Sequence, residues 1–122
     1  MKNAVVWSEI AVSDLRCATA FYEKLLDGKL KPESFGPYEI ALFPHAADGI
    51  GGCLMKGEGY EPSAKGTVTY LAAVPGIDAA LERARSAGAK VLMPKTELPG
   101  KQGFIAHIQD CEGNRIGLHA MS

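Results

Sequence analysis

The sequence predicts an α+β protein made of two modules with the same element order: a strand, a helix and three more strands. A strand pattern followed by an amphipathic helix occupies residues 4–28, and the same order returns at residues 68–88. The chain then ends in a predicted hairpin at residues 103–119. Each half alone has one helix on a small sheet, which buries little core. The two halves should therefore join into a cupped mixed sheet, with one face of each sheet on its helix.

The first module begins with residues 4–12, which alternate and are rich in Val and Ile. Ser13 and Asp14 then supply N-cap side chains, and apolar residues recur at helical spacing until Gly28. Three further strands are expected, at residues 30–32, 38–43 and 50–55. The Asp48-Gly49 pair predicts a turn between the last two.

The second module follows a linker rich in Gly, Lys and Glu. Module one is expected at about residues 2–57, the linker at 58–65 and module two at 66–120. Before the hairpin, the patterns predict a strand at 68–74, a helix at 77–87, a short strand at 90–93 and a mobile loop at 94–103. An offset of 62 residues lays Val12 on Val74 and Ala18 on Ala80, a weak but ordered repeat.

The final hairpin has a predicted register. If Asp110 lies opposite Asn114, antiparallel pairing sets His107 opposite Gly117 and Ile105 opposite His119, all on one face. The other face is continuously apolar and should meet the core; it carries Phe104, Ala106, Ile108, Ile116 and Leu118.

Composition excludes several classes of function. The chain has 122 residues and a net charge of -1, which gives no electrostatic footprint for nucleic acid or a membrane surface. No apolar run approaches ~18 residues, and Glu9 interrupts any signal-peptide pattern, so a cytoplasmic location is expected. Three cysteines without CxxC spacing argue against a disulfide framework and a structural zinc site.

Two motifs carry a family resemblance. The run V-S-D-L-x-x-A-x-x-F-Y-x-x-L at residues 12–25 and the closing D-x-E-G-N-R-I-x-L-H at 110–119 resemble the vicinal oxygen chelate superfamily. That superfamily includes glyoxalase I, extradiol dioxygenases, fosfomycin resistance proteins and bleomycin-binding proteins. The resemblance implies a glyoxalase-like fold and a homodimer, but says little about the substrate, because this fold hosts several chemistries.

The resemblance also implies where a metal would be held. Metal-binding members are similar in using one His or Glu from each of four strands, and three of these places correspond to Trp7, Thr69 and Gly117. The fourth place lies within residues 51–54, where only Cys53 could bind a metal. A divalent ion needs roughly three or more protein donors to be held tightly, so we expect no metal and no other cofactor.

Strand parity suggests which side chains line the cup. Trp7, Glu9 and Ala11 should face it from the first strand. The remaining positions expected on this face are Thr69, Leu71, Ala73, Ile105, His107, Gly117 and His119. We expect Glu9, partly desolvated, and His107 to be the proton-transferring residues. The expected ligand-binding residues are Trp7, Thr69, Leu71, Ile105, Gly117 and His119.

Three functions are compatible with these residues. The leading hypothesis is a metal-free relative of glyoxalase that binds a small molecule in an apolar cup. A second is a lyase or isomerase in which Glu9 and His107 exchange a proton with the substrate. A third is a non-catalytic interaction subunit whose cup is filled by Trp7 and Leu71. The sequence leaves open whether the protein is an enzyme, and a substitute metal site of Glu9, His107 and His119 is a minor alternative.

Overall fold

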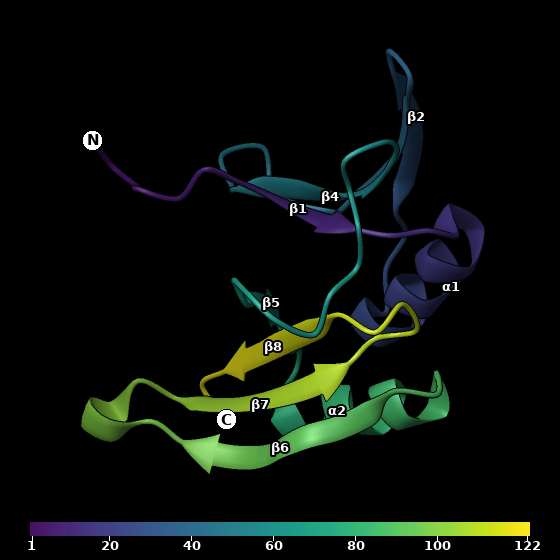
Figure 1. Cartoon of the computed structure of the whole chain (residues 1–122). Coiled ribbons are helices and arrows are strands. Elements are labelled where there is room, and N and C mark those ends of the chain that lie inside the picture. Colours follow the sequence, from purple (N-terminus) through teal and green to yellow (C-terminus); the bar gives the residue numbers. More distant parts are fainter.

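The computed structural model describes all residues, 1–122, and contains two four-stranded sheets, each with one helix (Figure 1). The first module consists of β1 (Trp7–Ala11), α1 (Leu15–Leu26), β2 (Lys31–Phe35), β3 (Tyr38–Leu42) and β4 (Gly51–Lys56). The second consists of β5 (Thr69–Ala72), α2 (Ile77–Ser86), β6 (Lys90–Glu97), a 3₁₀ turn (Pro99–Lys101), β7 (Phe104–Gln109) and β8 (Arg115–Ala120). The predicted α+β class and the two modules are confirmed. No helix has the length and apolar character needed to cross a membrane.

The two sheets have the same topology. Their strand orders are β1-β4-β3-β2 and β5-β8-β7-β6, with β1 parallel to β4, β5 parallel to β8, and all other pairs antiparallel. One face of each sheet packs on its helix, and we call the opposite face the cup face. The first strand of each module is a free edge. The edges of β1 and β5 are therefore available to form a boundary between the modules.

Helix α1 forms where the sequence predicts it. The Asp14 side chain accepts a hydrogen bond from the Cys17 backbone N–H at 3.1 Å, as expected of an N-cap. The helix ends at Leu26, and Asp27 rather than Gly28 takes the left-handed C-cap conformation, with φ 52°. The apolar stripe is buried against the sheet; it comprises Ala18, Phe21, Tyr22 and Leu25.

One core joins the two modules. Eighteen buried residues from both sheets and both helices form a single cluster. The predicted apolar face of the hairpin belongs to it, since Ile108, Ile116 and Leu118 are no more than 2% exposed. Full burial of each such side chain contributes about 1.5–3 kcal/mol. The predicted pairs His107 with Gly117 and Ile105 with His119 are also confirmed.

The β7–β8 turn contains a buried carboxylate that links the modules. Asp110 is 6% exposed and accepts hydrogen bonds from the backbone N–H groups of Glu112 and Asn114, each at 2.8 Å. The Asn114 side chain donates to it at 3.0 Å, and the hydroxyl of Tyr22 in α1 donates to the same oxygen. Burial, followed by the charge of Asp110, raises the pKa of Tyr22, so the hydroxyl keeps its proton. The buried charge is thus fully hydrogen-bonded.

The same turn also holds the start of the first helix. The Glu112 carboxylate accepts hydrogen bonds from the backbone N–H groups of Ser13 and Asp14, at 3.0 and 2.8 Å. These groups precede the helix, where a negative charge is favourable. The Asn114 amide donates to the carbonyl of Ala11 at 2.8 Å. The hairpin of the second module therefore fixes β1 and α1 of the first.

The internal repeat differs in register from the predicted one. The N–H of Val12 donates to the carbonyl of Met55 at 3.0 Å, and the N–H of Ala73 donates in the same way to His119 at 2.9 Å. Val12 therefore corresponds to Ala73, and the prediction that it matches Val74 is wrong. Equivalent positions on β1 and β5 are 61 residues apart, as in the hydrogen-bonded pair of Ser8 and Thr69.

The helices depart from the predicted offset as well. The buried stripe of α2, which is Ile77, Ala80, Leu81 and Ala84, repeats the spacing of the stripe in α1. Ala18 therefore corresponds to Ile77 and not to Ala80. Equivalent strand positions are 61 residues apart, whereas Ala18 and Ile77 are 59 apart, so no single offset can align both elements.

Strand β6 is longer than the sequence predicts. Residues 94–97, expected in a loop, continue the strand because Thr96 and Glu97 pair with Ile105 and Phe104. Pro94 lacks an N–H, which an edge strand tolerates, and β6 is at the edge of its sheet. The expected mobile loop is thereby reduced to the short turn around Pro99–Lys101.

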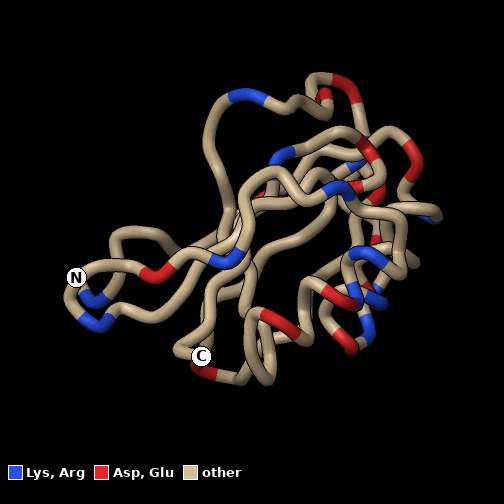
Figure 2. The backbone as a smooth tube through the Cα atoms, turned by 90° about the horizontal axis from the view of Figure 1, so that it is seen from below, with Lys and Arg blue, Asp and Glu red and all other residues tan.

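Surface charge contributes little to this arrangement. Lys and Arg lie interspersed with Asp and Glu along the chain (Figure 2). In every ion pair at least one side chain is largely exposed, and such pairs contribute about 0–1 kcal/mol. The common core and the Asp110 turn are the main links between the modules.

Replacing Tyr22 with Phe should lower the free energy of unfolding by about 1.5–3 kcal/mol, because it removes a buried hydrogen bond to a charged group. Urea denaturation measures this change. Tyr38→Phe is the matched control on β3, and it should cost less than about 0.5 kcal/mol because Tyr38 is half-buried and outside the turn. Equal losses in the two variants would contradict the role given to the Tyr22 hydroxyl.

Candidate ligand-binding site

A cavity of about 630 Å³ lies where the edge strands β1 and β5 approach each other. Ten of its sixteen lining residues are hydrophobic, and none is charged. It is lined by Val5, Trp7, Ser8, Leu26, Phe43, Pro44, Ile50, Gly51, Gly52, Thr67, Val68, Thr69, Tyr70, Leu71, Ala72 and Val74. Its size and apolar lining are typical of sites for small organic molecules.

One hydrogen bond bridges the two edges beside this cavity. The hydroxyl groups of Ser8 and Thr69 are 3.0 Å apart and lie at equivalent positions of the two modules. Both residues line the cavity. The cavity therefore belongs to the boundary between the modules, and neither module forms it alone.

Trp7 is a wall of the cavity rather than a filling. A side-chain carbon on Gly51 would lie 2.9 Å from the indole ring and 3.3 Å from the ring of His45, so the ring covers this glycine. The Trp7 side chain remains 46% exposed. The hypothesis of a cup filled by Trp7 and Leu71 is therefore not supported by the position of the indole.

The prediction that Thr69, Leu71 and Ala73 lie on the cup face is wrong. The parallel register sets Tyr70 beside Gly117, while Thr69 and Leu71 lie beside Ile116 and Leu118 on the helix-facing side. The one-residue error in the repeat reverses every side chain on the strand. Thr69 and Leu71 nevertheless line the cavity, as does Trp7. The other expected ligand-binding residues, Ile105, Gly117 and His119, do not line it.

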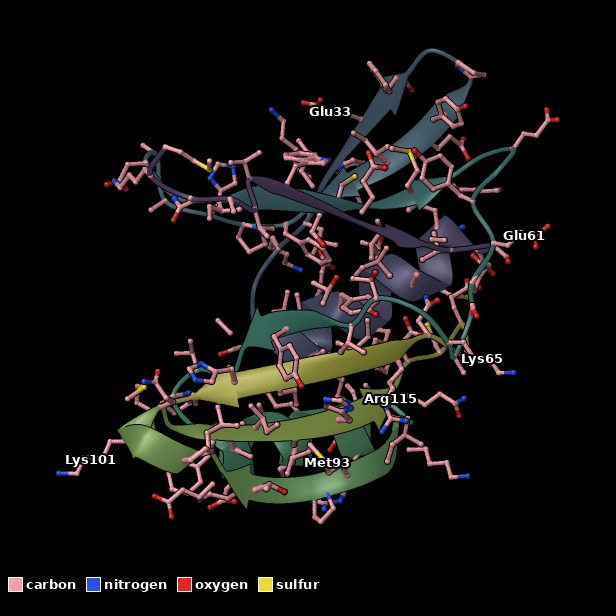
Figure 3. All side chains as sticks on the ribbon, turned by 60° about the vertical axis from the view of Figure 1, so that its left-hand side comes forward. Glu33, Glu61, Lys65, Met93, Lys101 and Arg115 are labelled. Carbon is pink, nitrogen blue, oxygen red and sulfur yellow. The ribbon has the colours of Figure 1, made fainter.

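Tyr70, His107 and Arg115 form a chain of hydrogen bonds on the second cup face. Figure 3 labels Arg115. The Tyr70 ring covers Gly117, and its hydroxyl lies 2.5 Å from Nε2 of His107. Arg115 Nε donates to His107 Nδ1 at 2.8 Å. Because a guanidinium can only donate, Nδ1 must accept, and the neutral ring carries its proton on Nε2 and donates to Tyr70.

This chain favours the neutral imidazole. Burial, followed by the positive charge of Arg115, lowers the pKa of His107 below its ordinary value. A histidine with a lowered pKa contributes stability that is fully present above the unfolded value of about 6.5, and this stability is lost as the pH falls from that value through the lower pKa of the folded state.

Glu9 has different partners on the first cup face. Its carboxylate accepts a hydrogen bond from the Tyr60 hydroxyl at 2.8 Å and a longer one from Trp7 Nε1 at 3.3 Å. It is exposed, so the expected partial desolvation is wrong. No ion pair joins it to His107, which is bonded to Tyr70 and Arg115. The predicted proton-transfer pair is thus not assembled within the chain.

Tyr60 in the linker lies beside Glu9 on the first cup face, a position that the sequence does not predict. A small second cluster of buried residues, Ile40, Cys53 and Met55, lies on the first cup face, with Tyr60 packed against it from the linker. The Tyr60 ring also meets the Tyr38 ring edge-on at 5.6 Å. Its hydrogen bond to Glu9, followed by burial, raises the pKa of Tyr60, so the hydroxyl remains a donor. The linker therefore covers part of the first cup.

The four places of a metal site can now be aligned through the internal repeat. Trp7 corresponds to Val68 rather than Thr69, and Gly117 corresponds to Cys53. Only Cys53 has a ligating atom, and burial raises the pKa of its thiol to about 11. A metal binds the thiolate, which is scarce at neutral pH when the pKa is so high. The residues present do not fit the metal site of the metal-binding members.

The alternative site of Glu9, His107 and His119 is not formed either. His119 Nε2 lies 2.7 Å from the carbonyl oxygen of Gln102, away from the partners of Glu9. Nowhere in the chain do three or more His, Cys, Asp or Glu side chains gather closely enough to hold a metal ion.

A family model matches residues 4–118, and its description is the Glyoxalase/Bleomycin resistance protein/Dioxygenase superfamily. The chain belongs to this superfamily. The match covers both modules and the β7–β8 turn. It confirms the family indicated by the two sequence motifs, while membership alone assigns neither a substrate nor a reaction. Among curated proteins, none matches the chain significantly.

Solved structures of other proteins have the same fold. A glyoxalase I variant from Zea mays has a TM-score of 0.70 at 22% identity, covering 95% of this chain and 45% of that one. This chain therefore spans less than half of that enzyme's length. The fosfomycin resistance protein FosX from Listeria monocytogenes has a TM-score of 0.70 at 20% identity, covering 98% and 92%. UcmS2 has a TM-score of 0.69 at 25% identity, covering 98% of both chains.

Arg115→Met should raise the pKa of His107 toward its ordinary value, because it removes both the positive charge and the donor at Nδ1. The imidazole proton shifts in an NMR pH titration measure this pKa. Lys90→Met, which removes a charge from β6 of the same sheet, is the control and should leave it nearly unchanged. The same pKa in both variants would show that Arg115 does not control the ring.

Proposed function

We propose that this protein binds a small, mainly apolar molecule without a metal, in the cavity between β1 and β5. The observation that supports this best is the cavity itself, which has a volume of about 630 Å³ and no charged lining residue. Trp7 supports it further, because a half-exposed indole beside an open apolar site offers a stacking surface for a ligand. We place this function in the cytoplasm, without nucleic acid or membrane partners.

The ligand's contacts follow from the lining. Most of the lining residues are apolar, and the hydroxyl groups among them belong to Ser8, Thr67, Thr69 and Tyr70. Ser8 and Thr69 already bond to each other. A ligand that buries about 100 Å² of its apolar surface there gains about 2.5 kcal/mol. Affinity should therefore rise with the apolar area of the ligand.

The alternative of a lyase or isomerase that uses Glu9 and His107 receives less support. Each of the two side chains has its own partners, and no contact joins them. General acid–base catalysis needs both groups within hydrogen-bonding reach of one substrate. We therefore propose binding as the function, rather than catalysis by this pair.

Filling the cavity should abolish binding. Val68→Phe adds bulk to the lining. It should lower the affinity for the neutral fluorescent probe N-phenyl-1-naphthylamine by about tenfold or more, which corresponds to a loss of about 1.4 kcal/mol in binding free energy. Val6→Phe is the matched control, because Val6 is exposed and outside the lining. Probe fluorescence gives both affinities, and melting temperatures verify folding. Undiminished binding by Val68→Phe would refute this site.

Removal of metal should have no effect. Dialysis against a chelator is expected to leave the melting temperature and probe affinity unchanged, because the four ligand places hold Trp7, Cys53, Val68 and Gly117. Elemental analysis of protein purified without chelator provides the second measurement. About one zinc, nickel or manganese per chain, with a stabilising effect on folding, would overturn the metal-free proposal.

We further propose a homodimer. Several large apolar side chains around the cavity mouth are exposed in the single chain, and edge strands of this kind are usually covered. These residues are Val5, Trp7, Ile50, Tyr70 and Val74. Sedimentation at micromolar concentration should give twice the chain mass of 12.9 kDa. A stable species of one chain mass would rule the dimer out.

A further inference from the structure

No positively charged side chain is paired with the Glu9 carboxylate. It makes no ion pair with any Lys, Arg or His, and its only hydrogen-bond partners are the neutral donors of Tyr60 and Trp7. A carboxylate has about four acceptor positions. Because these two donors occupy only part of its capacity, Glu9 can accept further hydrogen bonds from a molecule outside the chain.

Aromatic rings adjoin this charge. Trp7 and Tyr60 are within hydrogen-bonding distance of the carboxylate, and Tyr38 packs edge-on against Tyr60 at 5.6 Å. The faces of aromatic rings carry partial negative charge and attract ammonium groups, and a tryptophan does so most strongly. A carboxylate beside two such rings, with no positive group bonded to it, is complementary to an organic cation.

Trp7 connects this charge to the cavity. The indole ring lines the apolar cavity, while its N–H donates to Glu9. The cavity itself has no charged lining residue. A molecule bound in the cavity can therefore contact a charged group, the Glu9 carboxylate, if it extends past the edge of the Trp7 ring.

We infer that the site selects apolar organic cations, whose hydrocarbon part occupies the cavity and whose ammonium group lies against Glu9 and the Trp7 ring. This inference rests on the proposed function, because it assumes that the cavity takes a ligand. It adds a chemical class, amines with an apolar body, and a specificity-determining residue, Glu9.

A matched series of eight-carbon probes tests the charge preference: octylamine, octanol and octanoate are a cation, a neutral molecule and an anion of similar length. The chain has a single tryptophan, so its fluorescence reports directly on Trp7. We expect octylamine to bind about fivefold or more tightly than octanol, from one partly exposed ion pair and one cation–π contact. Octanoate should bind most weakly, and high salt should reduce the preference for octylamine.

Two variants separate charge from packing. Glu9→Gln keeps an acceptor for Trp7 and Tyr60 but removes the charge, so octylamine should then bind no more tightly than octanol, with octanol unchanged. Glu58→Gln removes an exposed carboxylate from the linker and should leave all affinities unaltered. Melting temperatures of both variants verify the fold.

The outcomes are distinct. Equal binding of octylamine and octanol, tighter binding of octanoate, or an octylamine preference that survives Glu9→Gln would each overturn the cation inference while leaving the cavity proposal intact. If none of the three probes changes the fluorescence of Trp7 or the melting temperature, the proposed function fails together with the inference.

Discussion

The buried carboxylate of Asp110 is the interaction on which the arrangement of the two modules depends. An unpaired charge in the interior is costly unless hydrogen bonds compensate it, and here two backbone groups, Asn114 and Tyr22 supply them. Because Tyr22 belongs to the first module, the compensation is complete only when the modules are docked. Glu112 in the same turn then fixes the start of the first helix. The closing motif at residues 110–119 thus has a structural role, because its side chains hold the two modules together.

The cavity is a consequence of this docking. Once the hairpin turn holds the end of β1, the edges of β1 and β5 meet at the bond between Ser8 and Thr69, and the adjoining space has only uncharged walls. Besides the hydroxyls in the cavity, polar groups lie on the two cup faces: an acceptor at Glu9 on one, and a hydrogen-bonded chain ending at Tyr70 on the other. Sites with chemically different ends of this kind are suited to orienting a ligand.

How well each feature could be predicted from the sequence depended on how far apart along the chain the interacting residues are. The N-cap at Asp14 and the hairpin pairs, such as His107 with Gly117, follow from local patterns, and the structure has them. The face of Thr69 depends on register, and equivalent strand positions are 61 residues apart rather than the predicted 62. The place of Tyr60 depends on how a linker crosses a sheet, for which no local signal exists. The expected partial desolvation of Glu9 was wrong for the same reason, since the exposure of a side chain depends on the assembled modules.

The most direct measurement of the central claim is an amide chemical-shift map of the protein titrated with octanol. If the ligand occupies the space between the edge strands, the largest changes will fall on residues 50–52 and 67–72, which line it. Amides of Ile105, His107 and Gly117, on the second cup face, should change little. Changes concentrated on those three residues, with residues 67–72 unaffected, would contradict the assignment of the site to the boundary between the modules.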